Sequence, residues 1–217
     1  MPIVLNDILD AAEARVLHDA ASALAFENGR RTAGRIARDV KDNLQAVAGA
    51  QTNAVLDKLR NSLSAHATFQ AVAYPRAIDR MMVTRTEGGG QYGDHVDNAL
   101  MGGARADVSF TFFLSDPESY EGGELTISDR AEARSFKLQQ GEVIVYPSTT
   151  LHRVEPVTKG SRLVVVGWVT SWIRDAAQRE ILFDLWRAIT AAEAAADSAQ
   201  VQTLTKTHSN LIRMWAT

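Results

Sequence analysis

Hydrophobic and polar positions in the first third of the chain follow a helical period. Apolar residues recur every three to four positions over residues 7–26, behind a candidate N-cap at Asn6 or Asp7, and Asn28-Gly29 is the predicted end of this helix. Residues 52–64 predict a second amphipathic helix. The segment between them, residues 32–45, is polar and irregular. We expect the two helices to brace a sheet.

The pattern changes to short β-rich runs between residues 76 and 170. Glycine and proline turn signals separate these runs, as is typical of strands joined by tight connections. The predicted strands cover residues 81–84, 107–114, 124–127, 134–138, 143–146 and 162–169. Many short strands with close turns predict a sandwich or barrel of the jelly-roll kind.

The helical period returns after Trp172. One apolar stripe contains Ile181, Leu182, Leu185, Trp186 and Ile189, an alanine run follows at 191–196, and a last helix carries Leu204, His208, Leu211, Ile212 and Trp215. These helices could form a lid, a dimer surface or a packing layer. The predicted organisation is an N-terminal bracing region (1–75), a core (76–175) and a C-terminal extension (176–217).

Composition and charge narrow the function classes. The 217 residues are 46% apolar, which suffices for one substantial core, and the formal charge of −3 comes without a block of either sign. Neither a nucleic acid nor a membrane is therefore an expected partner. The chain contains no cysteine, so a bound metal would need His, Asp or Glu ligands. Without a signal peptide or an apolar span of ~20 residues, the expected location is cytoplasmic.

The most specific chemistry lies in Tyr92-Gly-Asp-His95-Val-Asp97, with His152 and Arg162 downstream. Two imidazoles and one carboxylate can hold a divalent iron on one face and leave the opposite positions open. On a strand, His95 and Asp97 would project from the same side, and the fold would have to bring His152 to them. Arg162 begins an apolar run, where a buried cation would need an anion.

A structural interpretation competes with this one. His-x-Asp alone is weak, His152 could be a core histidine, and Arg162 could pair with Asp107 or Glu124. Two further groups have a simpler interpretation than a role in catalysis. Lys41, Asn43 and Gln45 suit a solvated loop near an entrance, and Ser148, Thr149 and Thr150 suit a turn.

At this point the chain resembles a known family. The order His-x-Asp, then His, then Arg ten residues later is similar to that of the iron(II)- and 2-oxoglutarate-dependent dioxygenases, in their prolyl-4-hydroxylase-like branch. Four segments resemble the bacterial PKHD-type hydroxylases in particular, and together with weaker similarity in the flanking helices they extend the resemblance over most of the chain. These segments are residues 92–98, 122–127, 146–163 and 167–175.

The resemblance implies an α+β protein with a double-stranded β-helix (jelly roll) core, N-terminal bracing helices and a small C-terminal helical extension. It implies iron(II) bound by His95, Asp97 and His152 as the catalytic centre, with Arg162 pairing with the distal carboxylate of 2-oxoglutarate. The implied reaction is hydroxylation by dioxygen with release of succinate and carbon dioxide, and ascorbate is a candidate reductant.

The chain departs from the family pattern at Thr86, where a tyrosine is common nine residues before the first metal-binding histidine. Thr86 could hold the co-substrate itself, Tyr92 or Tyr146 could compensate, or the co-substrate could be held less firmly. Tyr92 fits the family position three residues before that histidine. Asn98 could line the substrate side of the metal or simply form a turn.

Two other functions stay open. A cupin-like metalloprotein without a 2-oxo acid would explain residues 141–152, although cupins usually present His-x-His rather than His-x-Asp. A non-catalytic small-molecule sensor could keep the same fold. The substrate is either a small molecule or a peptidyl side chain, with the small molecule favoured, and the C-terminal apolar stripes favour a homodimer.

Overall fold

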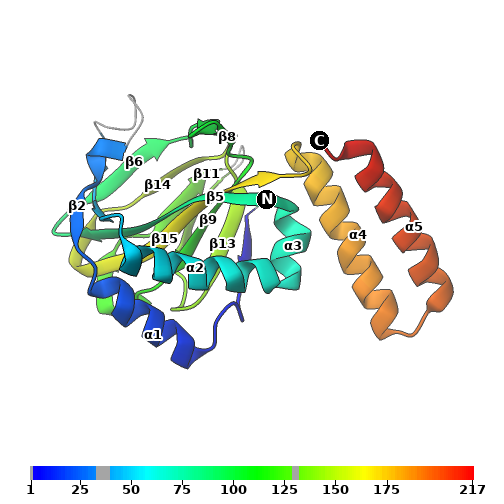
Figure 1. Ribbon diagram of the computed structural model, residues 1–217, viewed down its shortest axis with the longest axis horizontal. Helices are drawn as coiled ribbons and strands as arrows, with labels where there is room; N and C mark the ends of the chain where they lie inside the picture. Colours follow the sequence, from blue (N-terminus) through cyan, green and yellow to red (C-terminus); the bar gives the residue numbers. More distant parts are fainter. Residues whose placement is uncertain (1, 33–39, 129–131) are drawn as a thin grey trace.

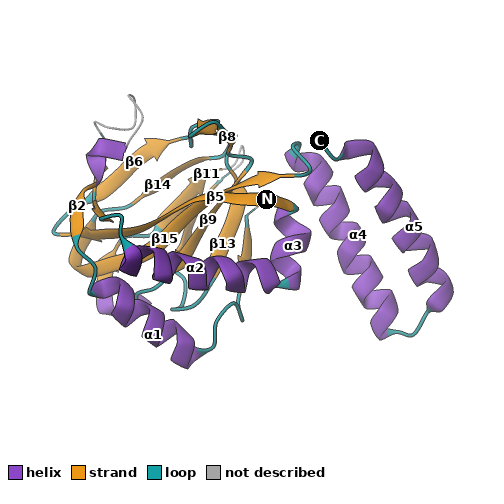
Figure 2. Ribbon diagram, in the orientation of Figure 1, coloured by secondary structure: helices purple, strands orange, loops and turns teal. Residues whose placement is uncertain are grey.

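The computed structural model describes residues 2–32, 40–128 and 132–217 as two stacked antiparallel sheets with helices on one outer face (Figures 1 and 2). The larger sheet has the order β1 (Ile3–Leu5), β13 (Val143–Pro147), β9 (Val108–Phe113), β15 (Val157–Ser171), β5 (Pro75–Glu87), β4 (Leu44–Ala46) and β2 (Phe26–Asn28), and β10 (Tyr120–Gly122) also pairs with β15. The smaller sheet has the order β12 (Ala133–Phe136), β11 (Leu125–Ser128), β14 (Leu151–Val154), β6 (Gln91–His95) and β3 (Lys41–Asp42). A short hairpin joins β7 (Leu100–Met101) to β8 (Ala104–Arg105).

This arrangement confirms the predicted α+β class and jelly-roll core. All six predicted strand segments are strands, and two of them are much longer than their apolar runs, because β5 and β15 pair with each other from Glu87 opposite Ser161 to Pro75 opposite Ser171. The polar ends of these two strands are paired by ladder hydrogen bonds, and Thr170 and Ser171 at the end of β15 are buried as well.

Side-chain alternation divides the interior into two apolar clusters. Phe112 and Val165 face the helices, where they pack with Leu59 and other helical residues. Their chain neighbours Phe113 and Val164 face the smaller sheet. Every residue of β9 is buried, since this central strand is covered on both faces.

Three helices cover the outer face of the larger sheet: α1 (Ala11–Ser22), α2 (Ala50–Ala65) and α3 (Ala67–Ala73) (Figure 2). The predicted cap of the first helix is wrong. Asp10 is the N-cap, because its carboxylate accepts hydrogen bonds from the backbone N–H groups of Ala12 and Glu13. The Glu13 carboxylate in turn accepts one from the backbone N–H of Asp10. Asp7 has φ 62°, which is not a capping conformation.

Two segments differ from prediction in their type of structure. The helix α1 ends at Ser22 rather than at Asn28-Gly29, and residues 26–28 form β2. The described part of the polar segment 32–45 contains β3 and the start of β4, so it is not uniformly irregular; residues 33–39 lie outside the described residues. Short polar strands of this kind are fixed by their neighbours, and their own sequence does not reveal them.

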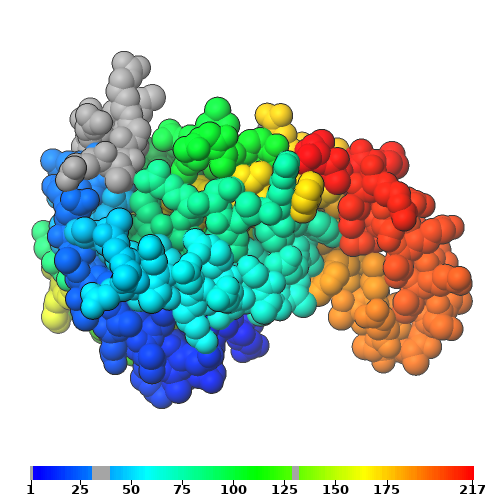
Figure 3. All heavy atoms as spheres, in the orientation of Figure 1, coloured from blue at the N-terminus to red at the C-terminus, as the bar shows by residue number. Residues whose placement is uncertain are grey.

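The two predicted C-terminal helices are α4 (Ala176–Ala194) and α5 (Ser198–Trp215), which form an antiparallel hairpin at one end of the molecule (Figures 1 and 3). Helix α4 contacts α3 and buries Arg179, Leu182, Ile189 and Ala192. Helix α5 packs mainly on α4 and has no fully buried residue. Among the described residues, no helix is long and apolar enough to cross a membrane.

Candidate active site

His95, Asp97 and His152 converge, as predicted, at one end of the smaller sheet. His95 is the last residue of β6 and lies directly opposite His152 of β14 in the strand ladder. Asp97 is not on a strand, contrary to the prediction, because β6 ends at His95 and the chain continues as a loop. One potential ligand atom from each of the three residues lies within 4.8 Å of the others. This facial arrangement of two imidazoles and a carboxylate suits iron(II).

The orientation of both imidazoles is fixed by the backbone two residues earlier. His95 Nδ1 lies 2.8 Å from the carbonyl oxygen of Gly93, and His152 Nδ1 lies 2.9 Å from that of Thr150. A carbonyl oxygen only accepts, so Nδ1 must carry the proton in each ring. Each Nε2 therefore keeps a lone pair that a metal can use.

The environment also keeps His95 neutral. Burial, and then the neighbouring His152, lower the pKa of His95 to about 4. The two rings lie 4.2 Å apart between centroids, so charging both would be costly. At neutral pH the site therefore presents His95 as an uncharged imidazole.

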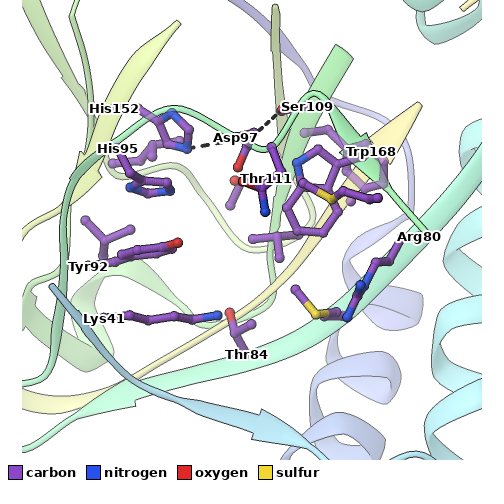
Figure 4. A pocket seen from close by; sticks show the side chains of 18 of the residues that line it. Lys41, Arg80, Thr84, Tyr92, His95, Asp97, Ser109, Thr111, His152 and Trp168 are labelled. Atoms are coloured by element: carbon purple, nitrogen blue, oxygen red, sulfur yellow. Dashed lines mark hydrogen bonds and ion pairs between the residues drawn. The ribbon is translucent and has the colours of Figure 1, made fainter. Parts of the chain in front are cut away.

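A hydroxyl pair positions the carboxylate of Asp97. Ser109 Oγ donates a 2.6 Å hydrogen bond to Asp97 Oδ2, and Ser109 and Ser148 hydroxyls are 2.8 Å apart (Figure 4). The sequence analysis did not identify Ser109, and it assigned Ser148 to a turn. Ser148 does lie in a turn, and its side chain is buried beside the site. The available signal for Ser109 was a polar residue within the largely apolar run of residues 108–114.

Two tyrosines enclose the histidines. The ring of Tyr92 stacks on His95 at 3.6 Å and 15°, and Tyr146 meets His152 edge-on at 5.1 Å. Burial raises the pKa of Tyr92 to about 12 and also raises that of Tyr146. Both phenols therefore keep their protons and can donate hydrogen bonds at neutral pH.

Arg162 lies deep in the same pocket on β15, directly opposite Thr86 of β5. It is 2% exposed, and its Nε and Nη2 atoms have no hydrogen-bond partner. Burial lowers the pKa of this guanidinium. Among the described residues it forms no ion pair, so the predicted structural pairing with Asp107 or Glu124 is absent; Asp107 pairs with Arg105 instead. Two orphaned donors in one fork fit a bidentate carboxylate.

One cavity of about 230 Å³ joins these groups, and it also reaches Thr86 and Asn98. The structure thus brings together every predicted site residue: His95, Asp97, His152, Arg162, Tyr92, Thr86 and Asn98. The same pocket is also lined by Lys41, Arg80 and Trp168, which the sequence did not predict as site residues (Figure 4). The interpretation of Lys41 and Gln45 as a solvated loop is wrong, since both side chains are buried.

Comparisons with known proteins agree with this geometry. Residues 81–170 match the model of the 2OG-Fe(II) oxygenase superfamily, and residues 176–217 match the model of the PKHD-type hydroxylase C-terminal domain. The chain is 44% identical over 218 residues to a PKHD-type hydroxylase of Maricaulis maris, covering 100% of this chain and 99% of that one. It is 45% identical over 216 residues to a PKHD-type hydroxylase of Parvibaculum lavamentivorans, covering 99% of each.

Solved structures of lower identity share the fold. A prolyl-4-hydroxylase of Pseudomonas putida aligns with a TM-score of 0.51 at 17% identity, over 78% of this chain and 92% of that one. A viral collagen prolyl hydroxylase of Paramecium Bursaria Chlorella virus-1, in a 2-oxoglutarate complex, aligns with a TM-score of 0.55 at 18% identity, over 78% and 96%.

Proposed function

Because the chain belongs to the PKHD-type hydroxylases of the 2OG-Fe(II) oxygenase superfamily, we propose specific roles for its pocket residues in iron(II)- and 2-oxoglutarate-dependent hydroxylation. The facial triad His95, Asp97 and His152 is the iron site. Arg162 binds the distal carboxylate of 2-oxoglutarate. Membership of this family also decides against the cupin-like and sensor alternatives.

The observation that carries this assignment is the buried, incompletely partnered guanidinium of Arg162. A buried charge without an ion pair costs several kcal/mol, roughly, in a folded protein. The site is therefore incomplete until an anion meets Nε and Nη2. A dicarboxylate that reaches from the triad to Arg162 would satisfy both positions at once.

Three neighbours have supporting roles in this proposal. Tyr92 holds His95 in place by stacking, and its protonated phenol can donate to a co-substrate oxygen. Thr86 stands opposite Arg162 and offers a hydroxyl at the same end of the pocket. Asn98 follows the triad carboxylate by one residue and borders the substrate side.

When bound, iron(II) and 2-oxoglutarate together reduce dioxygen, release succinate and carbon dioxide, and insert one oxygen atom into a substrate C–H bond. The protein places the reactants and limits the access of water. Burial of His152, Tyr146 and Arg162 provides that enclosure. The modest cavity, which must also hold the co-substrate, supports a small molecule as the substrate.

The test is anaerobic addition of iron(II) and then 2-oxoglutarate, with measurement of the weak visible charge-transfer band and of succinate after air is admitted. We expect a saturable band in the wild-type protein. The substitution Arg162→Met should weaken 2-oxoglutarate binding by at least about tenfold, since a charge-assisted pair is lost, while iron affinity changes little.

Arg153→Met is the matched control, because Arg153 is on β14 of the smaller sheet and pairs with Glu155 and Asp94 outside the pocket. Equal 2-oxoglutarate affinity in Arg162→Met and the wild type would disprove the role of Arg162. A complete lack of succinate from the iron-loaded wild type would disprove the proposed reaction.

A further inference from the structure

The C-terminal extension is bonded to the core at a backbone position that also serves the metal site. Arg179 of α4 is 5% exposed, and its Nη2 donates a 3.1 Å hydrogen bond to the carbonyl oxygen of Asp107, the residue directly before β9. The same oxygen accepts a 3.3 Å hydrogen bond from the backbone N–H of Ser148. A carbonyl oxygen has two lone pairs, so it can accept from both donors at once. Arg179 and Ser148 are therefore joined through one acceptor.

Ser148 connects this acceptor to a metal ligand. Its hydroxyl lies 2.8 Å from that of Ser109, which donates to Asp97 Oδ2 (Figure 4). Both serines are buried, so water does not compete for these hydrogen bonds. A continuous path of hydrogen bonds thus leads from α4 to the triad. Its members are the Arg179 guanidinium, the Asp107 carbonyl, Ser148, Ser109 and the Asp97 carboxylate.

The turn that contains Ser148 also orients a second ligand. Residues 148–150 connect β13 to β14, and the carbonyl oxygen of Thr150 accepts the hydrogen bond from His152 Nδ1. The backbone N–H of Thr150 donates to the carbonyl oxygen of Pro147, which closes the turn. Holding this turn at Ser148 therefore restrains the hydrogen-bond partners of two of the three triad residues.

Arg179 is itself held rigidly. Its Nη1 donates to the carbonyl oxygens of Ile173 and Arg174, which precede α4, so the planar guanidinium has three carbonyl acceptors in all. Arg179 also lines a small cavity of about 60 Å³ together with Tyr146 and Pro147, the residues that lead into the turn. The start of α4 and the turn are therefore neighbours in space, and the guanidinium has little freedom to move between them.

We propose that Arg179 is a positioning residue for the iron site, through which the C-terminal extension restrains Asp97 and His152. Groups that orient a metal ligand directly change metal affinity by ten- to a hundredfold, roughly, when they are removed. Arg179 acts through Ser148 and Ser109, so its effect should be smaller. This inference rests on the proposed function, because it takes the triad as the iron site.

The test measures the dissociation constant of the full-length protein for iron(II) by anaerobic titration, without turnover. Arg179→Met removes the donors and keeps an unbranched side chain, and it should raise this constant by about three- to tenfold. Arg179→Lys keeps a cationic donor but loses the planar fork, and it should raise the constant by about twofold or more. The lysine variant keeps the test informative if the methionine variant does not fold.

Two variants of the same helix are the controls. Arg187→Met removes an exposed charge of α4 that pairs with Asp184. Leu182→Ala leaves a cavity where the fully buried Leu182 side chain packs, so it should lower the melting temperature at least as much as Arg179→Lys does. Neither control should change the affinity for iron(II) by more than about twofold, because neither residue belongs to the hydrogen-bond path.

A double-mutant cycle tests whether Arg179 acts through Ser109. Ser109→Ala breaks the path next to Asp97, so a second break at Arg179 should then have less effect on that carboxylate. The double variant Ser109→Ala/Arg179→Met should therefore raise the dissociation constant by clearly less than the product of the two separate factors.

Three results would overturn the inference. Unchanged iron(II) affinity in the Arg179 variants, an equal loss of affinity in Leu182→Ala, or factors that simply multiply in the double variant would each show that Arg179 contributes only to stability. A wild-type protein that does not bind iron(II) would overturn the proposed function, and this inference with it. The wild-type titration therefore distinguishes the two failures.

Discussion

Ser109 shows how a single hydroxyl prepares the metal site. Its 2.6 Å hydrogen bond occupies Oδ2 of Asp97, and Ser148 supports it from the other side. The hydrogen bond thereby fixes the carboxylate beside His152, whose Nε2 lies 3.9 Å from the same oxygen. Groups that hold metal ligands in this way typically change metal affinity by ten- to a hundredfold, roughly, when they are removed.

Ser109→Ala should therefore raise the dissociation constant for iron(II) by about tenfold or more, measured by anaerobic titration. Ser135→Ala is the matched control, since Ser135 also shares a hydroxyl hydrogen bond, with Thr126 on the smaller sheet. Both variants should lose a little thermal stability, but only Ser109→Ala should lose iron affinity. Equal iron affinity in the two variants would contradict the positioning role.

Thr86 can be tested in the same manner. Thr86→Val keeps the shape of the side chain and removes the hydroxyl, so 2-oxoglutarate should bind roughly three- to tenfold more weakly, as expected for one lost hydrogen bond. The affinity for iron(II) should not change. Thr84→Val, two residues earlier on the same buried face, is the control. If 2-oxoglutarate binds Thr86→Val as tightly as the wild type, the hydroxyl has no part in holding the co-substrate.

At the scale of single residues, the sequence revealed the groups whose chemistry is unusual in their position. His95, Asp97, His152 and Arg162 are polar groups at the edges of apolar runs, and their spacing resembles that of a known family. Ser109 and Trp168 were missed because the sequence alone does not show which face of a strand buried on both sides lines a pocket. Only the pairing of β9 and β15 with their neighbours shows that these two side chains face the pocket.

At the scale of elements, predictions succeeded where burial dictates the structure. Five of the six predicted segments became strands with buried residues in a core. The sixth, β12, is mostly exposed and is held by its pairing with β11. Elements that depend on neighbours were missed. The strand β3 is two residues long and exists because Lys41 and Asp42 pair with β6. The same pairing delivers Lys41 to the pocket, so the error in the fold and the error in the site have one cause.

A glycine explains part of the motif at residues 122–127. Gly123 has φ 70°, which favours glycine, and a Cβ there would lie 3.0 Å from Arg162 Cδ and 3.1 Å from Tyr120 Cε2. The turn before β11 can therefore pack closely on the stem of Arg162. This turn therefore confines the guanidinium of Arg162, although Gly123 does not line the pocket itself.

At the scale of the whole molecule, the site draws on both sheets and on distant parts of the chain. Its residues extend from Lys41 to Trp168, and β1 and β4 from the predicted N-terminal region join the larger sheet. The division at residues 75 and 175 stays a prediction, as does the homodimer. Helix α4 is tied to the core by Arg179, which donates to the carbonyl oxygens of Ile173 and Asp107.

The C-terminal hairpin makes a second, titratable contact with the core. His208 of α5 lies 2.5 Å from the hydroxyl of Tyr74, the residue that ends α3. Burial raises the pKa of Tyr74 to about 12, so its phenol keeps the proton and can donate it to the imidazole. Burial lowers the pKa of His208, which means that the folded protein favours the neutral ring.

This contact predicts that stability falls in mild acid. Below the unfolded-state pKa of roughly 6.5 the unfolded chain binds a proton that folded His208 resists, so unfolding becomes easier as pH falls from there through the lower folded pKa. At pH values above that range His208 is neutral in both the folded and the unfolded chain, so its full contribution to the free energy of unfolding is present. Thermal unfolding of the wild type and His208→Gln between about pH 5 and 8 should show the difference in melting temperature shrinking or reversing toward acid. A constant difference over the whole range would mean that His208 does not couple the hairpin to pH.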